Sequence, residues 1–288
     1  MTNPVFADAP LALIIGCGGM GMGTARALGK RHPLLIVDID AVRLAAAVET
    51  LHLEGYSVSG QPCDITNPEQ VKALGRRLSQ GHGVRVLAHI TAVGAIVKDW
   101  RVMMAVDLLG PHLIADAAEP HMVPGGVALF IGSLAGYLPP NDPRIDALLD
   151  APLQPGFMDA ITAILGDNPP WIDTYAYAKL GMTRLAESRA MAWGARNVRA
   201  ISVSPGMIDS PMARAQGAYL PSHDGEQREV PRTEKMEEIP LGREGSLQEV
   251  ISVLDFLASD AASFINGIDI VIDGGHRAVW RARGVITR

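Results

Sequence analysis

The sequence predicts an α/β protein: a Rossmann-type, doubly wound parallel sheet in a single domain with an inserted helical lid. Short runs rich in Ile, Leu and Val alternate with longer helical patterns, which is typical of βαβ units whose sheet is covered on both faces. A glycine-rich loop also stands between the first apolar run and the helical pattern that follows it. No shift in composition marks a linker, so one domain is expected over residues 1–288.

The apolar runs predict seven strands, and helical patterns fill most of the gaps between them. The predicted strands are Leu11–Ile15, Leu34–Asp38, Ser57–Cys63, Val84–Ile90, Val127–Ser133, Arg199–Ser204 and Ile268–Ile272. Two capping boxes, Thr66–Glu69 and Ser246–Glu249, are expected to begin helices, because the hydroxyl and the carboxylate can each accept a hydrogen bond from a free backbone N–H.

Two segments interrupt the alternation, and both follow the carboxyl ends of strands, where open α/β sheets bind ligands. Residues 137–173 contain seven of the twenty prolines around a short amphipathic pattern. Residues 207–240 mix apolar side chains with a charged run. We expect the first segment to be an inserted lid and the second to be a substrate loop.

Composition narrows the class of protein. The net charge of −6 and the pI near 5.7 argue against a nucleic-acid partner. No apolar run approaches the roughly 20 residues needed to span a bilayer, and the N-terminus lacks a signal-peptide pattern, so a cytoplasmic protein without membrane contact is expected. Cys17 and Cys63 have no CxxC spacing and the eight histidines form no HExxH motif, so neither a disulfide framework nor a metal site is expected.

The glycine loop predicts a dinucleotide site. Gly16, Gly18 and Gly21 fit the pattern G-x-G-x-x-G between a strand and a helix. Glycines there let the backbone approach a pyrophosphate at the helix N-terminus, where free N–H groups favour negative charge. An unrelated glycine-rich turn is the alternative interpretation.

An acidic residue follows the second predicted strand. Asp38 stands 22 residues after Gly16, where a carboxylate would accept hydrogen bonds from the adenosine ribose and repel a 2′-phosphate. This favours NAD over NADP. Arg43 or Arg26 could instead turn toward such a phosphate, so NADP stays open as an alternative.

Tyr175 and Lys179 form the most informative pair in the chain. A helix places residues i and i+4 on one face, so the lysine ammonium can lie beside the tyrosine phenol and make it a useful proton donor and acceptor near neutral pH. Taken alone, this spacing also fits a partly buried tyrosine and a solvated lysine on an ordinary amphipathic helix.

With these motifs in this order, the chain from about Leu11 to Gly275 resembles the short-chain dehydrogenase/reductase family. Four further segments strengthen the resemblance. They are similar to the family's adenine-contacting segment, its catalytic-serine segment, its Pro-Gly motif beside the nicotinamide and its last strand with the terminal turn: Cys63–Thr66, Ile131–Gly136, Ser204–Met212 and Asn266–Gly275, respectively.

The resemblance implies a role for each matching residue. Tyr175 would exchange a proton with the substrate oxygen while hydride passes to or from the nicotinamide, Lys179 would favour the phenolate and bind the nicotinamide ribose, and Ser133 would hold the substrate oxygen. Tyr177 is a poor rival because it projects from another face of the helix, where it borders the substrate or packs in the core. The implied cofactor-binding residues are Gly16, Gly19, Met20, Gly21, Met22, Asp38, Ile39, Asp64, Ile65, Ile90, Thr91, Tyr175, Lys179, Pro205, Gly206, Ile208 and Ser210.

Several positions depart from the family pattern. Gly16-Cys17 replaces the usual Thr-Gly, and His89–Ala92 replaces Asn-Asn-Ala-Gly, which puts support between strands in doubt. Asp107 stands where a catalytic asparagine usually organises a proton relay; it is either a fourth catalytic residue in that relay or a purely structural helix residue.

The insertion and the C-terminal sequence resemble the 3α-hydroxysteroid dehydrogenase/carbonyl reductase branch. This likeness implies a bulky apolar alcohol or ketone, steroid-like or terpenoid, covered by Leu138, Phe157, Met212 and Tyr219, in a homodimer or homotetramer. The leading hypothesis is thus an NAD-dependent oxidoreductase of an apolar, cyclic secondary alcohol. A sugar or polyol dehydrogenase of the same family and a non-catalytic NAD-sensing protein are the alternatives, the latter motivated by Asp107 and His89–Ala92.

Overall fold

A seven-stranded parallel sheet forms the centre of the computed structural model, which describes residues 8–94, 97, 99–215, 219–221 and 229–287. The strand order is β11-β6-β5-β4-β1-β2-β3, and all neighbouring strands in it are parallel. The strands are β1 (Leu11–Ile15), β2 (Leu34–Asp38), β3 (Val58–Pro62), β4 (Val84–His89), β5 (Met122–Ile131), β6 (Arg199–Pro205) and β11 (Asp269–Ile272). The predicted α/β class and doubly wound parallel sheet are confirmed.

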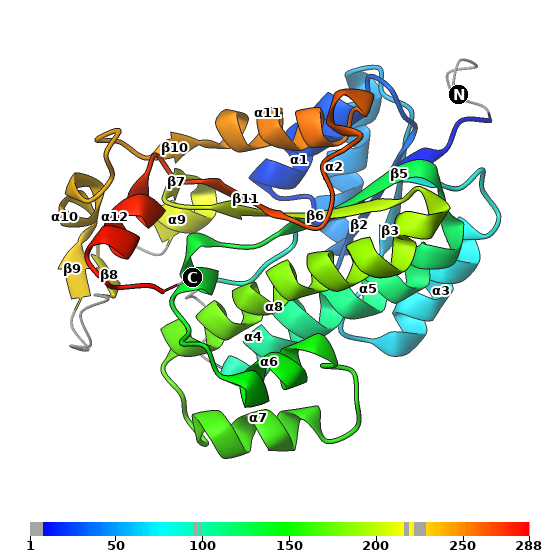
Figure 1. Cartoon of the computed structure of the whole chain (residues 1–288). Coiled ribbons are helices and arrows are strands. Elements are labelled where there is room, and N and C mark those ends of the chain that lie inside the picture. The colour runs from blue at the N-terminus through cyan, green and yellow to red at the C-terminus, as the bar shows by residue number, and fades with distance from the viewer. Residues whose placement is uncertain (1–7, 95–96, 98, 216–218, 222–228, 288) are drawn as a thin grey trace.

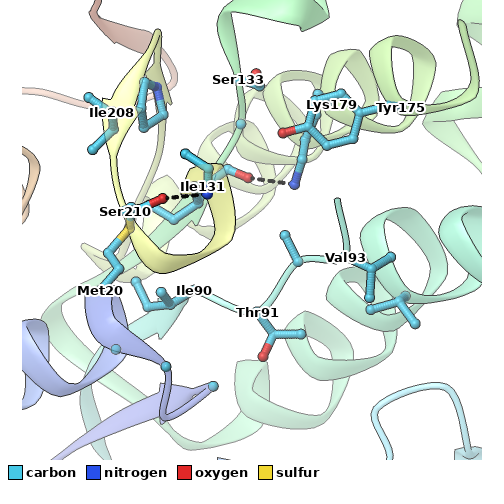
Figure 2. Close-up of a pocket in the computed structure, with 18 of the residues that line it drawn as sticks. Met20, Ile90, Thr91, Val93, Ile131, Ser133, Tyr175, Lys179, Ile208 and Ser210 are labelled. Atoms are coloured by element: carbon cyan, nitrogen blue, oxygen red, sulfur yellow. Dashed lines mark hydrogen bonds between the residues drawn. The ribbon is translucent and has the colours of Figure 1, made fainter. Parts of the chain in front are cut away.

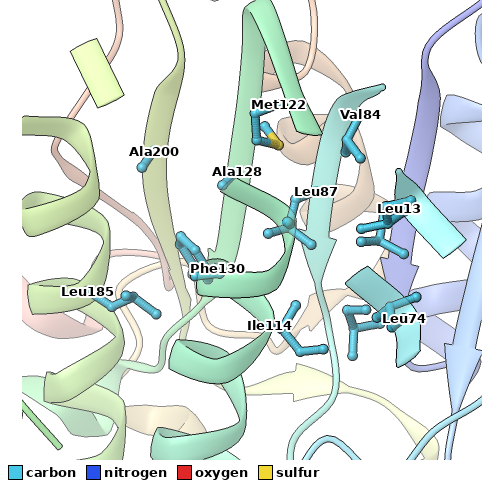
Figure 3. Packing of buried hydrophobic residues seen from close by; sticks show 14 of the residues in the cluster. Leu13, Leu74, Val84, Leu87, Ile114, Met122, Ala128, Phe130, Leu185 and Ala200 are labelled. Carbon is cyan, nitrogen blue, oxygen red and sulfur yellow. The ribbon is translucent and has the colours of Figure 1, made fainter. Parts of the chain in front are cut away.

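Helices cover both faces of this sheet (Figure 1). Alternate residues of each strand point to opposite faces, so Leu13 and Leu87 pack on one side and Ala12 and Ala88 on the other. The first face is covered by α3 (Pro68–Leu78), α5 (Gly110–Ala118) and α8 (Trp171–Trp193), whose packing Figure 3 shows, and the second by α1 (Gly19–Leu28), α2 (Ala41–Leu53) and α11 (Leu247–Leu257).

The remaining elements are shorter. They are α4 (Trp100–Met104), α6 (Pro143–Asp150), α7 (Phe157–Leu165), α9 (Pro211–Ala215), α10 (Arg232–Glu237), α12 (His276–Ala282), and the paired short strands β7 (Ile208–Asp209) with β10 (Gly245–Ser246) and β8 (Tyr219–Pro221) with β9 (Glu229–Pro231). No helix in the described part of the chain is long and apolar enough to cross a membrane.

One of the two predicted capping boxes is present. The Ser246 hydroxyl accepts a hydrogen bond from the backbone N–H of Glu249, whose carboxylate accepts one from the Ser246 N–H. The Thr66–Glu69 prediction is wrong, because Asn67 begins that helix by accepting hydrogen bonds from the next two free N–H groups. The Thr66 hydroxyl donates instead to Asp64 at 2.7 Å.

The inserted segment packs on the outside of α8. Phe157 and Ile161 of α7 are buried in a cluster with Tyr177 and Leu180 of α8, away from the sheet (Figure 1). Tyr177 is therefore a core residue. The expectation that Phe157 covers the substrate is wrong, because the apolar side of α7 packs against α8.

Candidate active site

A cavity of about 750 Å³ opens at the carboxyl ends of the strands. Its walls come from the loops after β1, β2, β3, β4, β5 and β6, from the start of α8, and from α10 and α12. Ser133, Tyr175 and Lys179 lie on one side of it, across from Ile208 and Ser210, and Met20, Ile90 and Thr91 lie on another (Figure 2). Residues that are distant in the sequence thus face one space.

The glycine loop lines this cavity through its backbone. Gly16 has φ +99°, a conformation that favours glycine, and Gly18 precedes the first turn of α1. A Cβ atom on Gly21 would lie 2.0 Å from the carbonyl oxygen of Gly16, so the loop closes tightly against the helix start. The free N–H groups there form a site for an anion such as a diphosphate. Met22 is an exception among the predicted cofactor residues, because it packs against the hydrophobic core and does not line the cavity.

Asp38 is held at one end of the cavity by four donors. One carboxylate oxygen accepts from the Asp40 N–H at 3.0 Å and the Arg43 guanidinium at 2.6 Å, and the other accepts from the backbone N–H and the thiol of Cys17 at 2.9 and 3.1 Å. Burial opposes the charge, yet these hydrogen bonds lower the pKa of Asp38, so its carboxylate is ionised. Burial and the nearby carboxylate raise the pKa of the Cys17 thiol to about 11, which keeps it a donor.

The other predicted cofactor residues also line the cavity. They follow the carboxyl ends of the strands or begin the next element: Gly19, Met20, Ile39, Asp64, Ile65, Ile90, Thr91, Pro205, Gly206, Ile208 and Ser210. The structure therefore brings this set together as the motifs indicate.

Ser133 is fixed between β5 and α8. It precedes a 3₁₀ turn (Leu134–Tyr137), and its hydroxyl oxygen accepts a hydrogen bond from the Ala135 N–H at 3.2 Å. The hydroxyl hydrogen remains available to a ligand oxygen. A Cβ atom on Gly136 would lie 3.0 Å from the backbone nitrogen of Leu180, so the turn packs directly on α8. The serine is thereby held near the tyrosine-bearing helix.

Lys179 is buried beside Tyr175. Only 1 % of the lysine is exposed, and its ammonium lies 5.4 Å from the centre of the Tyr175 ring. It also donates to the Ile131 carbonyl at 3.4 Å and pairs with Asp107 at 3.3 Å. Burial opposes the charge, but Asp107 raises the pKa of Lys179 above its usual value. The lysine is a buried cation and not a solvated side chain.

Asp107 lies beneath the cavity. It belongs to a π-helical turn (Ala105–Leu109), and its second oxygen accepts from the Val93 N–H at 2.7 Å. Burial raises the pKa of Asp107, while Lys179 and the Val93 N–H oppose that rise. The structure thus places Asp107 within contact of the site, behind Lys179.

His89 is a buried polar residue that the family pattern does not contain. Neither ring nitrogen has a hydrogen-bond partner among the described residues, and burial together with the charge of Lys179 lowers the pKa of His89 to about 3. The ring is therefore neutral at pH 7. The following backbone keeps its support, since Ile90 and Thr91 both donate to the Ile15 carbonyl.

Sequence reasoning missed part of the cavity wall. Trp171 and Ile172 at the start of α8, His276 and Trp280 of α12, and Lys235 of α10 all line the cavity. For α12, the one signal in the sequence was that it follows the carboxyl end of the last strand, where ligands bind. Leu138 packs behind this wall against Leu134 and Trp280 and does not line the cavity, contrary to expectation; the side chains of Met212 and Tyr219 lie outside the described residues.

Comparisons with known proteins agree with this geometry. A family model described as short chain dehydrogenase matches residues 10–142, and one described as Enoyl-(Acyl carrier protein) reductase matches residues 161–277. The chain is 29% identical to trans-4-hydroxycyclohexanecarboxylate dehydrogenase of Sinomonas cyclohexanicum (93% of each chain covered) and 26% identical to the cis-4-hydroxycyclohexanecarboxylate dehydrogenase of the same organism (95% and 98% covered).

A solved structure shares the fold. A short chain dehydrogenase from Burkholderia cenocepacia J2315 in complex with NADP superimposes with a TM-score of 0.71 at 20% identity, covering 94% of this chain and 98% of that one. At this identity the likeness concerns the architecture alone.

Proposed function

The chain belongs to the short-chain dehydrogenase/reductase family of oxidoreductases, and we propose that it is an NAD-dependent dehydrogenase of an apolar, cyclic secondary alcohol. Members of the family bind a nicotinamide cofactor. The observation that carries the proposal is the meeting of Ser133, Tyr175 and Lys179 with the glycine loop in one cavity.

The residues present fit a dinucleotide. The backbone cradle at Gly16 and Gly21, which a side chain would fill, suits a diphosphate, and Asp38 suits the adenosine ribose. Lys179 and Tyr175 border the part of the cavity that the nicotinamide ribose would occupy. When bound, the nicotinamide supplies the acceptor for the hydride that leaves the alcohol carbon.

Proton transfer falls to Tyr175. In the oxidation the alcohol loses a hydride from carbon and a proton from oxygen, and the Tyr175 phenolate takes the proton. The buried ammonium of Lys179 lies 5.4 Å from the centre of the Tyr175 ring, and the Ser133 hydroxyl is proposed to donate a hydrogen bond that holds the reacting oxygen. Asp107 is proposed to keep Lys179 charged and in place, either directly or as a relay member that passes the proton onward.

NAD is proposed over NADP because of Asp38. Its carboxylate is ionised and would repel a 2′-phosphate, and it engages the Arg43 guanidinium that could otherwise bind one. The similar solved structure holds NADP, so cofactor choice is a property to be measured for this chain.

A cyclic substrate fits the remaining wall. Apolar side chains line this part of the cavity and suit an apolar ring: Val102, Val106, Leu134, Ile172 and Trp280. The two relatives named for hydroxycyclohexanecarboxylate support a ring that carries a secondary alcohol. Steroid-like and terpenoid alcohols are larger members of that class.

A direct test is a screen of purified protein with NAD and NADP side by side. The alcohols are substituted cyclohexanols, terpenoids, steroids and linear polyols, and reduced cofactor is measured by absorbance. We expect NADH with the cyclic alcohols and much slower turnover with NADP. Turnover of linear polyols alone would contradict the cyclic substrate and identify a polyol dehydrogenase. Cofactor binding without turnover of any alcohol would identify a cofactor-sensing protein.

A further inference from the structure

The ionisable side chains that line the cavity differ between its two ends. Among the described residues, the lining carboxylates are Asp38, which ends β2 and pairs with Arg43, and Asp64, which follows β3, both at the proposed adenosine end. Among the described residues, no carboxylate lines the end bounded by α10 and α12, whereas Arg232 and Lys235 do. A cavity with one sign of charge concentrates ligands of the other sign.

Lys235 of α10 lines the cavity close to His276 of α12. Leu134, the neighbour of Ser133, packs against Trp280. The Trp280 ring meets the His276 ring edge-on with centroids 4.7 Å apart, and the charge of Lys235 acts on His276 and helps to lower its pKa, after the larger effect of burial. A continuous wall thus leads from the reacting oxygen to Lys235, of which only 6 % is exposed.

Carboxylates stand behind this wall and not in it. Glu238 pairs with His276 at 3.1 Å and with Arg283 at 3.3 Å and does not line the cavity. Burial opposes its charge, but hydrogen bonds from His276 and Trp280 and the charge of Lys235 lower the pKa of Glu238. Glu238 thus pairs with Arg283 and also feels the charge of Lys235, and of these two cations Lys235 lines the cavity.

Arg232 serves another part of the site. It pairs with Glu244 and donates to the Ala213 carbonyl at 2.9 Å, and α9, which carries Ala213, begins at Pro211 against Gly19 of the cofactor loop. These contacts tie Arg232 to the segment beside the glycine loop, whereas Lys235 lies on the wall that His276 and Trp280 form.

We propose that Lys235 binds a carboxylate that the cyclic substrate carries on the side away from the reacting carbon. This inference rests on the proposed function and narrows its substrate class to hydroxy-substituted cyclic carboxylates. The apolar wall suits the ring, and a single compact ammonium in a water-poor pocket suits one monoanion. The competing explanation is that Lys235 only braces Glu238 and holds α12 in place.

The experiment compares substrates that differ in charge alone. trans-4-Hydroxycyclohexanecarboxylate and its carboxamide are assayed with NAD on the wild type, K235M, K235R and K72M, where Lys72 is an exposed lysine on α3. We expect the wild type to prefer the carboxylate in kcat/KM by about 30-fold or more, the scale of a buried charge pair. K235M should abolish most of that preference through KM, K235R should retain part of it, and K72M should match the wild type.

Binding of cyclohexanecarboxylate, which has no hydroxyl to oxidise, is measured by calorimetry on the protein with NAD. The proposal expects K235M to weaken it by about 30-fold.

A wild type that treats acid and amide alike overturns the inference while the proposed function stands. Lack of turnover with every alcohol overturns the proposed function, and the binding comparison then still decides on Lys235. A raised KM of NAD in K235M with unchanged charge preference would assign the lysine to the cofactor. If K235M fails to fold, the wild-type preference and K235R decide between substrate binding and bracing.

Discussion

The carboxylate of Asp107 lies 3.3 Å from the ammonium of Lys179, and both side chains are shielded from solvent. The π-helical turn that carries Asp107 interrupts regular helix geometry at this point, as such turns often do at functional sites. An asparagine there would leave the lysine charge without a counter-charge. The pair therefore makes the charge state of the lysine depend on a residue outside the cavity.

Replacing Asp107 by Asn should keep the hydrogen bond from Val93 but break the ion pair. Loss of one partner of a buried pair costs roughly 3–5 kcal/mol of unfolding free energy. Asp107 raises the pKa of Lys179 in the folded protein. The ion pair therefore stabilises the fold fully at pH values below the pKa of an unfolded lysine, and this stabilisation is lost as pH rises through the higher pKa of the folded state. As pH is raised above neutral, the variant should lose activity at a lower pH than the wild type does. Denaturant titration and a pH profile of kcat measure this; wild-type stability with an unshifted alkaline limb would contradict it.

Phenylalanine at position 175 removes the proton acceptor and leaves the ring. Turnover should fall by about 100-fold or more, because proton transfer by a positioned group contributes ~10²–10⁴-fold. NAD affinity, measured by fluorescence titration, should change little. Y177F is the matched control, since Tyr177 is buried in the cluster with α7 and lines no part of the cavity. An unchanged rate in Y175F would remove Tyr175 from the mechanism.

Serine at position 38 should shift cofactor choice toward NADP. The change removes a negative charge and releases Arg43, which lies 2.6 Å from Asp38, to meet a 2′-phosphate. Juxtaposed like charges cost several kcal/mol, so the ratio of kcat/KM for NAD to that for NADP should fall by ~100-fold or more. The double variant D38S/R43A should lose the gained NADP activity. A wild type that uses both cofactors equally would refute the role given to Asp38.

Alanine at position 21 should disrupt the glycine loop. Its Cβ would lie 2.0 Å from a backbone oxygen, which cannot rotate away, so about 1–3 kcal/mol of stability or more should be lost together with NAD binding. G18A is the matched control, because a Cβ there meets nothing within 4 Å and φ is −69°. Thermal melting of both variants provides the measurement, and equal melting temperatures would speak against the close contact.

Acid should destabilise the fold through its buried histidines. The pKa values of His89 and His112 are lowered to about 3, chiefly by burial. Each takes up a proton near pH 6.5 only when unfolded, so stability falls as pH drops from about 6.5 toward 3, by ~2 kcal/mol per histidine at pH 5. H89L should lessen this loss relative to the wild type in denaturant titrations at several pH values. Identical pH dependence in the two proteins would show that His89 is not the group that resists the proton.

Much of the fold was predictable because buried parallel strands are apolar runs. β1 and β2 match their predicted bounds, whereas β5 begins at Met122, five residues before the predicted Val127. Pro124, Gly125 and Gly126 hide this part of the strand in the sequence, and Met122 joins the sheet through pairing with Val84 of β4. The pattern of neighbouring residues does not reveal a pairing partner that is distant in the sequence.

The arrangement of the candidate site was predictable where a motif fixes the spacing. Ser133, Tyr175 and Lys179 face one cavity as the resemblance implies, but the thiol of Cys17 on Asp38 and the position of Lys235 arise from contacts between distant segments. Amphipathicity likewise indicated that one side of α7 would be buried without showing that α8 would bury it.

The contact of Gly136 with the backbone of α8 ties the turn that follows Ser133 to the helix that carries Tyr175. Serine turn and tyrosine helix abut without intervening side chains, so neither can shift without the other. Another part of the wall comes from α10 and α12, two separate segments that follow β9 and β11 in the chain. New substrates for this protein should therefore be sought by exchanging residues 232–237 and 276–282, with the serine turn and α8 left untouched.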